Sequence, residues 1–192
     1  TVVKLLRPGA EGATVAVIAQ ANSAARMAQA TGPFPANPAT RMFDDRLTLG
    51  SGADRIELYW FGAGHTDGDA FVVFPAHRAL HTGDAFPNKG VPIMDMNNGG
   101  SGVAYPDTLD KVAALPNIDV VITGHNATTL TIADVKTYAD FNRAFVDAVR
   151  AARKAGQTID DVVNTWKVPA RFLEDGYQQP QPARLRSNTE VV

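Results

Sequence analysis

Cysteine is absent from the 192-residue sequence. This absence excludes a disulfide framework, a thiolate zinc site and a cysteine nucleophile, so any metal would need histidine and carboxylate ligands. Histidine is scarce as well, because the sequence has only His65, His77, His81 and His125. Every hypothesis that needs an imidazole must draw on these four positions.

The sequence also lacks an excess of one charge and a long apolar run. Its formal net charge is −2 and both signs are mixed along the chain, so there is no electrostatic case for nucleic acid or an anionic membrane surface. No apolar run approaches the roughly 20 residues of a membrane-spanning helix, and the first residues do not form a basic and apolar signal segment. We therefore expect a soluble protein, with the compartment left open and periplasmic or secreted locations among the options.

The remaining composition is that of a folded domain. Apolar residues make up 45% of the chain and charged residues 20%, and 192 residues are enough for one domain with a substantial core. The sequence has no internal repeat and no domain-sized shift in composition. We expect one globular unit.

Strand and helix signals alternate in the first part of the chain. The β-branched run at 14–20 predicts a buried strand, and a capped helix is expected at 22–30. The three prolines of 31–40 exclude a helix or a central strand and favour an extended surface loop. Alternating apolar and polar positions at 46–49 and 55–61 predict two antiparallel strands joined by a tight turn.

The central part of the chain continues this pattern. Residues 70–74 and 79–82 predict two further strands, 106–115 a helix and 118–123 a buried strand. The Asn- and Gly-rich segment 87–102 is long for a loop in a compact domain. It is either a substrate-facing loop or a flexible excursion.

Helix signals dominate the last part of the chain. Thr131 and Asp134 resemble a capping box, and the apolar positions that follow predict one face of a long helix that ends at Gly156. A shorter helix is expected over 158–166. The tail at 167–192 carries Pro180 and Pro182 together with mixed charges, and we expect it to be loosely ordered.

The motif GHTDGD at residues 64–69 contains the first candidate site residue, His65. Its glycines let the backbone turn sharply and bring the imidazole close to another group. His65 is either a metal ligand or a hydrogen-bonding residue of the turn. For Asp67 we favour turn chemistry, in which the carboxylate bonds nearby backbone amides. Asp69 is expected to orient the loop or to accept a hydrogen bond from a neighbouring imidazole.

Two further candidates follow predicted strands. Asp84, in HTGDAF, lies where a strand leaves the sheet; it can bridge two cations or cap the next segment. His125 follows the strand at 118–123 in the same way. Together with His65, these residues place ligand-type side chains next to glycine at three strand ends, which favours a common metal site.

The other two histidines are expected to lie outside this site. His77 follows Pro75 at a bend and is expected to face solvent or cap the turn. His81 lies three residues before Asp84, so regular strand alternation places the two side chains on opposite faces.

These three motifs, GHTDGD, HTGDAF and ITGHN, resemble motifs of the metallo-β-lactamase superfamily in their residues and their order. The resemblance covers roughly residues 15–163. It implies an α+β fold, an αββα four-layer sandwich with metal ligands at one edge between two sheets. It also implies that His65 binds one metal and His125 the other, with Asp84 as the bridging and catalytic residue.

The sequence departs from the family pattern at one motif. The family's HxHxDH motif, which supplies most of the remaining ligands, does not occur in the sequence. We therefore expect a fold that is incomplete at its N-terminus, with a partial metallo-β-lactamase-like domain at 1–166 and a tail at 167–192. A degenerate family member that has lost metal binding is the alternative.

The resemblance implies a metal-dependent hydrolase. A complete site would hold two metal ions, expected to be zinc, and would attack an ester, thioester, lactone, amide or phosphoester of a small-molecule substrate with metal-activated hydroxide. Activity of this chain alone is in question because the HxHxDH ligands are missing. A non-catalytic module on the same fold and an iron-dependent redox relative are the alternatives. No nucleic acid or membrane partner is expected, and a homo-oligomer stays open.

Overall fold

The computed structural model describes residues 3–5, 16–29 and 39–192, and the predicted proline-rich loop lies largely outside these ranges. The strands are β1 (Val3–Leu5), β2 (Ala16–Gln20), β3 (Arg41–Phe43), β4 (Arg46–Leu49), β5 (Ile56–Tyr59), β6 (Phe71–Phe74), β7 (Ala79–Gly83) and β8 (Val120–Thr123). The α-helices are α1 (Ala21–Gln29), α2 (Tyr105–Ala113), α3 (Ile132–Lys154), α4 (Ile159–Thr165), α5 (Ala170–Glu174) and α6 (Pro182–Thr189).

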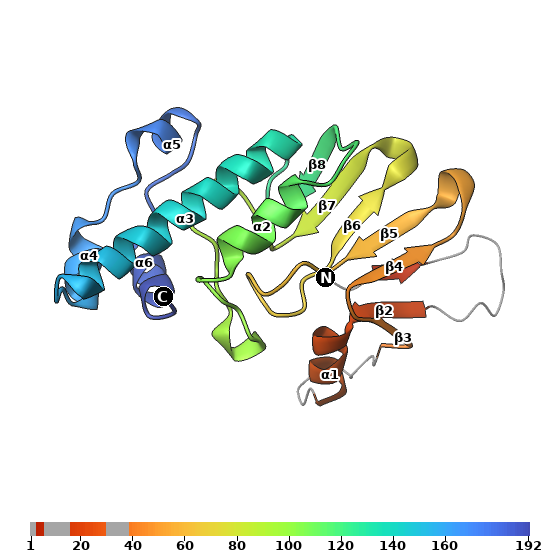
Figure 1. The fold of residues 1–192 in the computed structure, drawn as a ribbon, viewed down its shortest axis with the longest axis horizontal. Helices are drawn as coiled ribbons and strands as arrows, with labels where there is room; N and C mark the ends of the chain where they lie inside the picture. The colour runs from red at the N-terminus through yellow and green to blue at the C-terminus, as the bar shows by residue number, and fades with distance from the viewer. Residues whose placement is uncertain (1–2, 6–15, 30–38) are drawn as a thin grey trace.

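The strands form two sheets (Figure 1). The small sheet has the order β1-β2-β3, and the large sheet has the order β4-β5-β6-β7-β8. Neighbours in the large sheet are antiparallel except for β7 and β8, which are parallel. The expected antiparallel pair at 46–49 and 55–61 is confirmed as β4 and β5, with a short 3₁₀ turn at Gly52–Asp54 between them.

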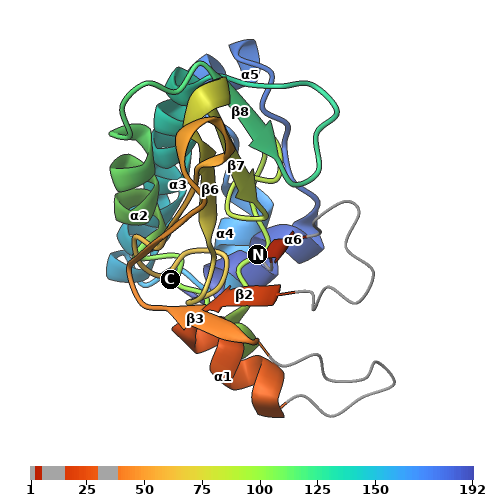
Figure 2. The same cartoon turned by 90° about the vertical axis from the view of Figure 1, so that its right-hand side faces the viewer.

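Side-chain alternation along β6 explains the layered structure. Phe71 and Val73 point into a core shared with helices α2 and α3, whereas Val72 packs in a second core with Ile18 and Phe43 of the small sheet. Helix α1 contacts the small sheet on β2 and β3 (Figure 2). The order of layers is therefore helix, small sheet, large sheet, helices, as expected for the α+β sandwich.

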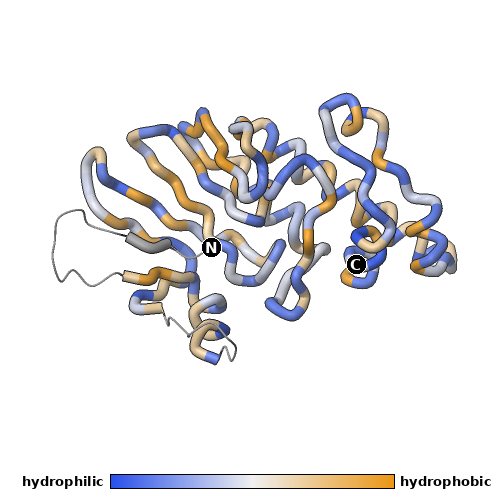
Figure 3. The backbone as a smooth tube through the Cα atoms, turned by 180° about the vertical axis from the view of Figure 1, so that it is seen from behind, coloured by the Kyte–Doolittle hydropathy of each residue, from blue (hydrophilic) through white to orange (hydrophobic). Residues whose placement is uncertain are grey.

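The main core lies between the large sheet and the two helices α2 and α3. The buried face of α3 includes Tyr138, Phe141 and Phe145, which recur at the spacing of a helix. The expected capping box is confirmed, because the Thr131 side chain accepts from the Asp134 amide and the Asp134 carboxylate accepts from the Thr131 amide. Figure 3 shows hydrophobic stretches along the strands of this sheet.

The expectation of a loosely ordered tail is wrong. Residues 167–192 form α5 and α6, and Phe172, Tyr177 and Leu185 are buried in the main core. The Lys89 ammonium also ties this segment to the rest of the fold, because it lies 3.0 Å from an Asp134 carboxylate oxygen and 3.1 Å from one of Asp175. Aromatic burial outweighs the disorder that the prolines and charges suggested.

Across residues 3–5, 16–29 and 39–192, no helix is both long enough and apolar enough to cross a membrane.

Truncation of Phe172 should test whether the C-terminal segment is part of the core. Phe172 is 2% exposed and its ring lies 5.2 Å from that of Phe141, so Phe172→Ala should lower the free energy of unfolding by about 3 kcal/mol in urea denaturation. The adjacent Leu173 is 50% exposed, and Leu173→Ala should change that free energy by no more than about 0.5 kcal/mol. Equal effects of the two variants would contradict the packing described here.

Candidate functional site

Four strand ends meet at one edge of the large sheet. Because β7 and β8 are parallel, the residues that follow them leave the sheet on the same side. Strands β5 and β6 run antiparallel to each other, so the connection between them, residues 60–70, lies at this same edge. The topology therefore brings together all three motifs that the sequence singled out.

The Asp84 turn is fixed from both sides. The Thr82 hydroxyl is buried and lies 3.3 Å from the carbonyl oxygens of both Phe86 and Ile122, to which it can donate. The side chain of Phe86 is fully buried in the main core. The position of Asp84 is thus set by a buried hydroxyl before it and a buried ring after it.

His125 is placed beside Asp84 by a continuation of the strand pairing. The Gly124 and His125 amides donate to the carbonyls of Phe86 and Pro87, at 3.4 and 3.0 Å. The His125 Nε2 atom then lies 3.1 Å from Asp84 Oδ1. Both side chains remain accessible, with 67% of His125 and 47% of Asp84 exposed. A Cβ at Gly124 would overlap the Asp84 carboxylate, so the close approach depends on glycine here.

The His65 loop is held by the long loop that follows β7. The His65 carbonyl accepts from the Asp95 amide at 2.9 Å, and the Gly64 carbonyl accepts from the Ser101 amide at 2.9 Å. Gly64 itself lies against the Tyr105 ring, where any Cβ would clash. Segment 87–102 is therefore anchored next to the site and is not a flexible excursion.

Asp69 forms a hydrogen bond with the imidazole of His65, which is one of the two roles expected for Asp69 from the sequence. His65 Nδ1 lies 3.2 Å from Asp69 Oδ1, and the Thr66 amide donates to Asp69 Oδ2 at 2.7 Å. An ionised carboxylate only accepts hydrogen bonds, so Nδ1 carries the proton and Nε2 stays available. Asp69 also orients the loop through Thr66, so both proposed roles are present.

The electrostatics of this pair favour its charged form. Burial lowers the pKa of His65, but the hydrogen bond and charge of Asp69 and the charges of Asp84 and Asp95 outweigh burial and raise it overall. Burial raises the pKa of Asp69, but its bonds to His65 and to the Thr66 amide outweigh burial and lower it overall. The pKa of His65 is thus raised and that of Asp69 lowered, because each group favours the charged form of the other.

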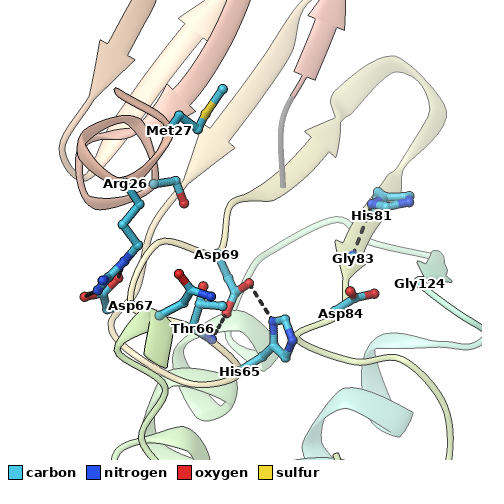
Figure 4. A pocket seen from close by; sticks show the side chains of 12 residues that line it. Arg26, Met27, His65, Thr66, Asp67, Asp69, His81, Gly83, Asp84 and Gly124 are labelled. Atoms are coloured by element: carbon cyan, nitrogen blue, oxygen red, sulfur yellow. Dashed lines mark hydrogen bonds and ion pairs between the residues drawn. The ribbon is translucent and has the colours of Figure 1, made fainter. Parts of the chain in front are cut away.

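These groups line a cavity of about 440 Å³. Figure 4 shows His65, Asp69, His81 and Asp84 grouped on one side of it. Helix α1 forms the opposite wall and is bound to the loop because Ser23 Oγ donates to the Gly68 carbonyl at 2.9 Å. The cavity is lined by Ser23, Arg26, Met27, His65, Thr66, Asp67, Asp69, His81, Gly83, Asp84, Asn98 and Gly124.

The expectation that the Asp67 carboxylate bonds backbone amides of its turn is wrong. Its carboxylate pairs with the guanidinium of Arg26 on α1 and not with a backbone amide of the turn. Its backbone carbonyl accepts from Asn22 and Trp60, at 2.8 and 2.9 Å. Arg26 lies 41 residues away in the sequence, and no local signal could have identified it as the partner.

The expectation that His81 and Asp84 lie on opposite faces is wrong, because both line the cavity. The pairing of β7 with β8 shifts register between His81 and Gly83, and the Gly83 amide donates to His81 Nδ1 at 3.1 Å. The extra residue of a bulge reverses the alternation beyond it. The glycine of the HTGD motif is the sequence feature that could have indicated this bulge. Burial lowers the pKa of His81, against an opposing effect of the Asp84 charge.

His77 is exposed in a 3₁₀ turn at the opposite end of β6, as expected. In the 87–102 loop, Met94 packs in the main core, whereas Met96 is 56% exposed. Only Asn98 of this loop lines the 440 Å³ cavity.

The metal-ligand roles of His65, Asp84 and His125 stay predictions. The fold pairs Asp84 with His125 and places His65 and Asp84 around one cavity. However, among residues 3–5, 16–29 and 39–192 no three His, Asp or Glu side chains form a group that could hold a metal ion. This donor set therefore does not fit a complete coordination shell, which for zinc needs at least three protein ligands.

Comparison with solved structures identifies the fold. The chain is similar to a metallo-β-lactamase from Pontibacter korlensis (TM-score 0.55, 17% identity, 67% of this chain and 58% of that one). It is also similar to the stereoselective inverting sec-alkylsulfatase Pisa1 from Pseudomonas sp. (TM-score 0.62, 16% identity, 81% of this chain and 26% of that one). No family model and no curated protein matches the sequence.

These likenesses show that the chain has a metallo-β-lactamase-type fold. This fold is used by hydrolases, among them a β-lactamase and an alkylsulfatase. The matched part spans less than two thirds of either relative, and identity below 25% identifies the fold alone.

Replacement of Asp69 should lower the pKa of His65. In Asp69→Asn the carboxylate that opposes the effect of burial is lost, so an NMR titration of the His65 ring should give a lower pKa than in the unmodified protein. Asp67→Asn is the control, because that carboxylate pairs with Arg26. An unchanged pKa in Asp69→Asn would contradict the described pair.

The same pair predicts how stability depends on pH. The raised pKa of His65 stabilises the fold fully below the ordinary value of 6.5, and this contribution is lost as pH rises through the folded-state pKa. The lowered pKa of Asp69 stabilises the fold above 3.8 and its contribution is lost as pH falls. The difference in free energy of unfolding between the unmodified protein and Asp69→Asn should therefore be largest between these two pH values.

Proposed function

We propose that this chain is the part of a metal-dependent hydrolase that carries the cavity and its strand-end residues. The proposed substrate is a small molecule with an ester, thioester, lactone, amide or phosphoester bond. The observation that carries the proposal is the convergence of His65, Asp84 and His125 at one sheet edge, with Asp84 and His125 in contact and a cavity beside them. A hydrolase-type fold around that edge supports it.

The residues at the sheet edge have distinct proposed roles. Asp69 fixes the tautomer of His65, which leaves Nε2 as the atom available to a ligand or to substrate. Asp84 and His125 are accessible, and each could exchange its contact with the other for a new partner. His81, placed by the bulge, adds a further imidazole to the same cavity.

The incomplete donor set limits what the chain does by itself. Zinc is the metal that a site of this type would hold, with another divalent metal or iron as the alternative. The remaining ligands would have to come from outside the described residues, in a longer protein or in another copy. We therefore expect weak metal binding, since the binding free energy depends on a complete ligand set.

Zinc titration tests this expectation. Isothermal titration should show weak binding, and NMR shifts should be localised to His65, His81 and His125. Asp84→Asn should weaken binding by at least about tenfold. His77→Asn is the matched control because His77 is exposed and lies away from the cavity. Tight binding of two zinc ions by this chain would contradict the incomplete shell.

Hydrolysis separates catalysis from simple binding. With zinc added, we expect slow cleavage of p-nitrophenyl acetate or of bis(p-nitrophenyl) phosphate, and Asp84→Asn should reduce the rate by at least about tenfold. His77→Asn should leave the rate unchanged. A rate that zinc and Asp84→Asn both leave unaffected would overturn the hydrolase proposal.

One observation favours a second candidate, a non-catalytic binding module on the same fold. Within the part of the chain that the structure describes, the site side chains bond one another and do not form a group for a metal ion. A binding module would keep its ligand in Asp84→Asn, whereas a hydrolase would lose its activity.

A further inference from the structure

A second cavity of about 850 Å³ adjoins the candidate site. Its walls come from three segments: residues 87–93, which follow Asp84, residues 125–126, which follow β8, and residues 176–184, which lead into α6. The C-terminal segment therefore forms one side of a groove whose other side belongs to the sheet edge.

The side chains around this groove are basic or amide-bearing. Lys89, His125 and Arg184 line it together with several asparagines and glutamines, and no aspartate or glutamate is among the described residues that line it. The 440 Å³ cavity is different, because three aspartates line it. Carboxylates therefore line the 440 Å³ cavity, beside Arg26, but not the described walls of the groove.

Arg184 is the cation of this groove that is available to a ligand. The Lys89 ammonium is engaged by two carboxylates, those of Asp134 and Asp175. Arg184 is half-buried in the first turn of α6, and no described carboxylate forms an ion pair with it. Arg186, two residues further along the same helix, is paired with Asp160.

His125 connects the two cavities. It lines the 850 Å³ groove, while its Nε2 atom lies 3.1 Å from Asp84 Oδ1 in the 440 Å³ cavity. A small molecule that reaches across His125 can therefore contact Asp84 with one end and Arg184 with the other.

We propose that the groove binds an anionic group of the substrate, with Arg184 as its ion-pair partner. This inference rests on the proposed function and specifies the substrate class: a molecule that carries a carboxylate, sulfate or phosphate group in addition to the bond that is cleaved. A guanidinium binds all three oxyanions through paired hydrogen bonds, and the groove's amide side chains can donate further bonds. Partial burial of Arg184 strengthens the interaction relative to a fully exposed arginine.

Anion titration tests the groove directly. Sodium acetate, sulfate and phosphate are titrated separately into the 192-residue protein at constant ionic strength, with chloride as the reference, and backbone amides are followed by NMR. At least one anion should shift the amides of residues 87–93 and 176–184 together with the Arg184 side-chain signal. The three arms show which oxyanion is preferred.

Variants of Arg184 give the decisive comparison. Arg184→Gln should weaken anion binding at least about tenfold, and Arg184→Lys, which keeps the charge without the fork, should weaken it less. Arg150→Gln on the exposed side of α3 is the matched control and should bind as the unmodified protein does. If no anion shifts the groove amides of the unmodified protein, or if Arg184→Gln and Arg150→Gln bind equally, the inference is wrong.

The test of the anion site and the test of the proposed hydrolase function can fail independently of each other. Anion binding in the groove does not require Asp84, so Asp84→Asn should bind the anion normally even though it loses hydrolysis. Zinc-dependent hydrolysis without an Arg184-dependent anion site would refute only the inference. An anion site without Asp84-dependent hydrolysis would refute only the proposed function.

Discussion

The parallel pairing of β7 and β8 is the constraint on which the candidate site depends. Parallel strands release their chains at the same edge, and the hydrogen bonds continue beyond the strands to Gly124 and His125. The Asp84–His125 contact follows from this pairing. The Asp84 turn is itself fixed by buried Thr82 and Phe86. Packing in the main core therefore determines where the exposed side chains of Asp84 and His125 lie.

Much of this arrangement is predictable from sequence. The apolar runs before Asp84 and His125 are long enough to identify strands, and the capping box of α3 is a local pattern with a local cause. Three polar motifs at strand ends were therefore expected to meet. The prediction that Asp69 restrains an imidazole succeeded because His65 is only four residues away.

The features that sequence reasoning missed depend on tertiary structure. That His81 and Asp84 both line one cavity depends on a register shift between His81 and Gly83, which regular strand alternation does not predict. The Arg26–Asp67 pair joins α1 to a distant loop. The C-terminal segment is ordered by its aromatic contacts with α3, whose ring positions cannot be known before the fold. Local propensity cannot detect such long-range gains.

The Lys89 contacts have a consequence for cooperativity. One ammonium joins the loop after Asp84, the start of α3 and the segment before α6. Local opening of the loop that carries Lys89 would break both ion pairs, and opening of either of the other two segments would break one of them. Protection of amide hydrogens against exchange in the three segments is therefore expected to be coupled. A proteolytic nick near Asp175 would consequently loosen the backbone on the far side of the groove, next to Asp84. The C-terminal segment therefore stabilises the loop that follows Asp84 at the edge of the large sheet.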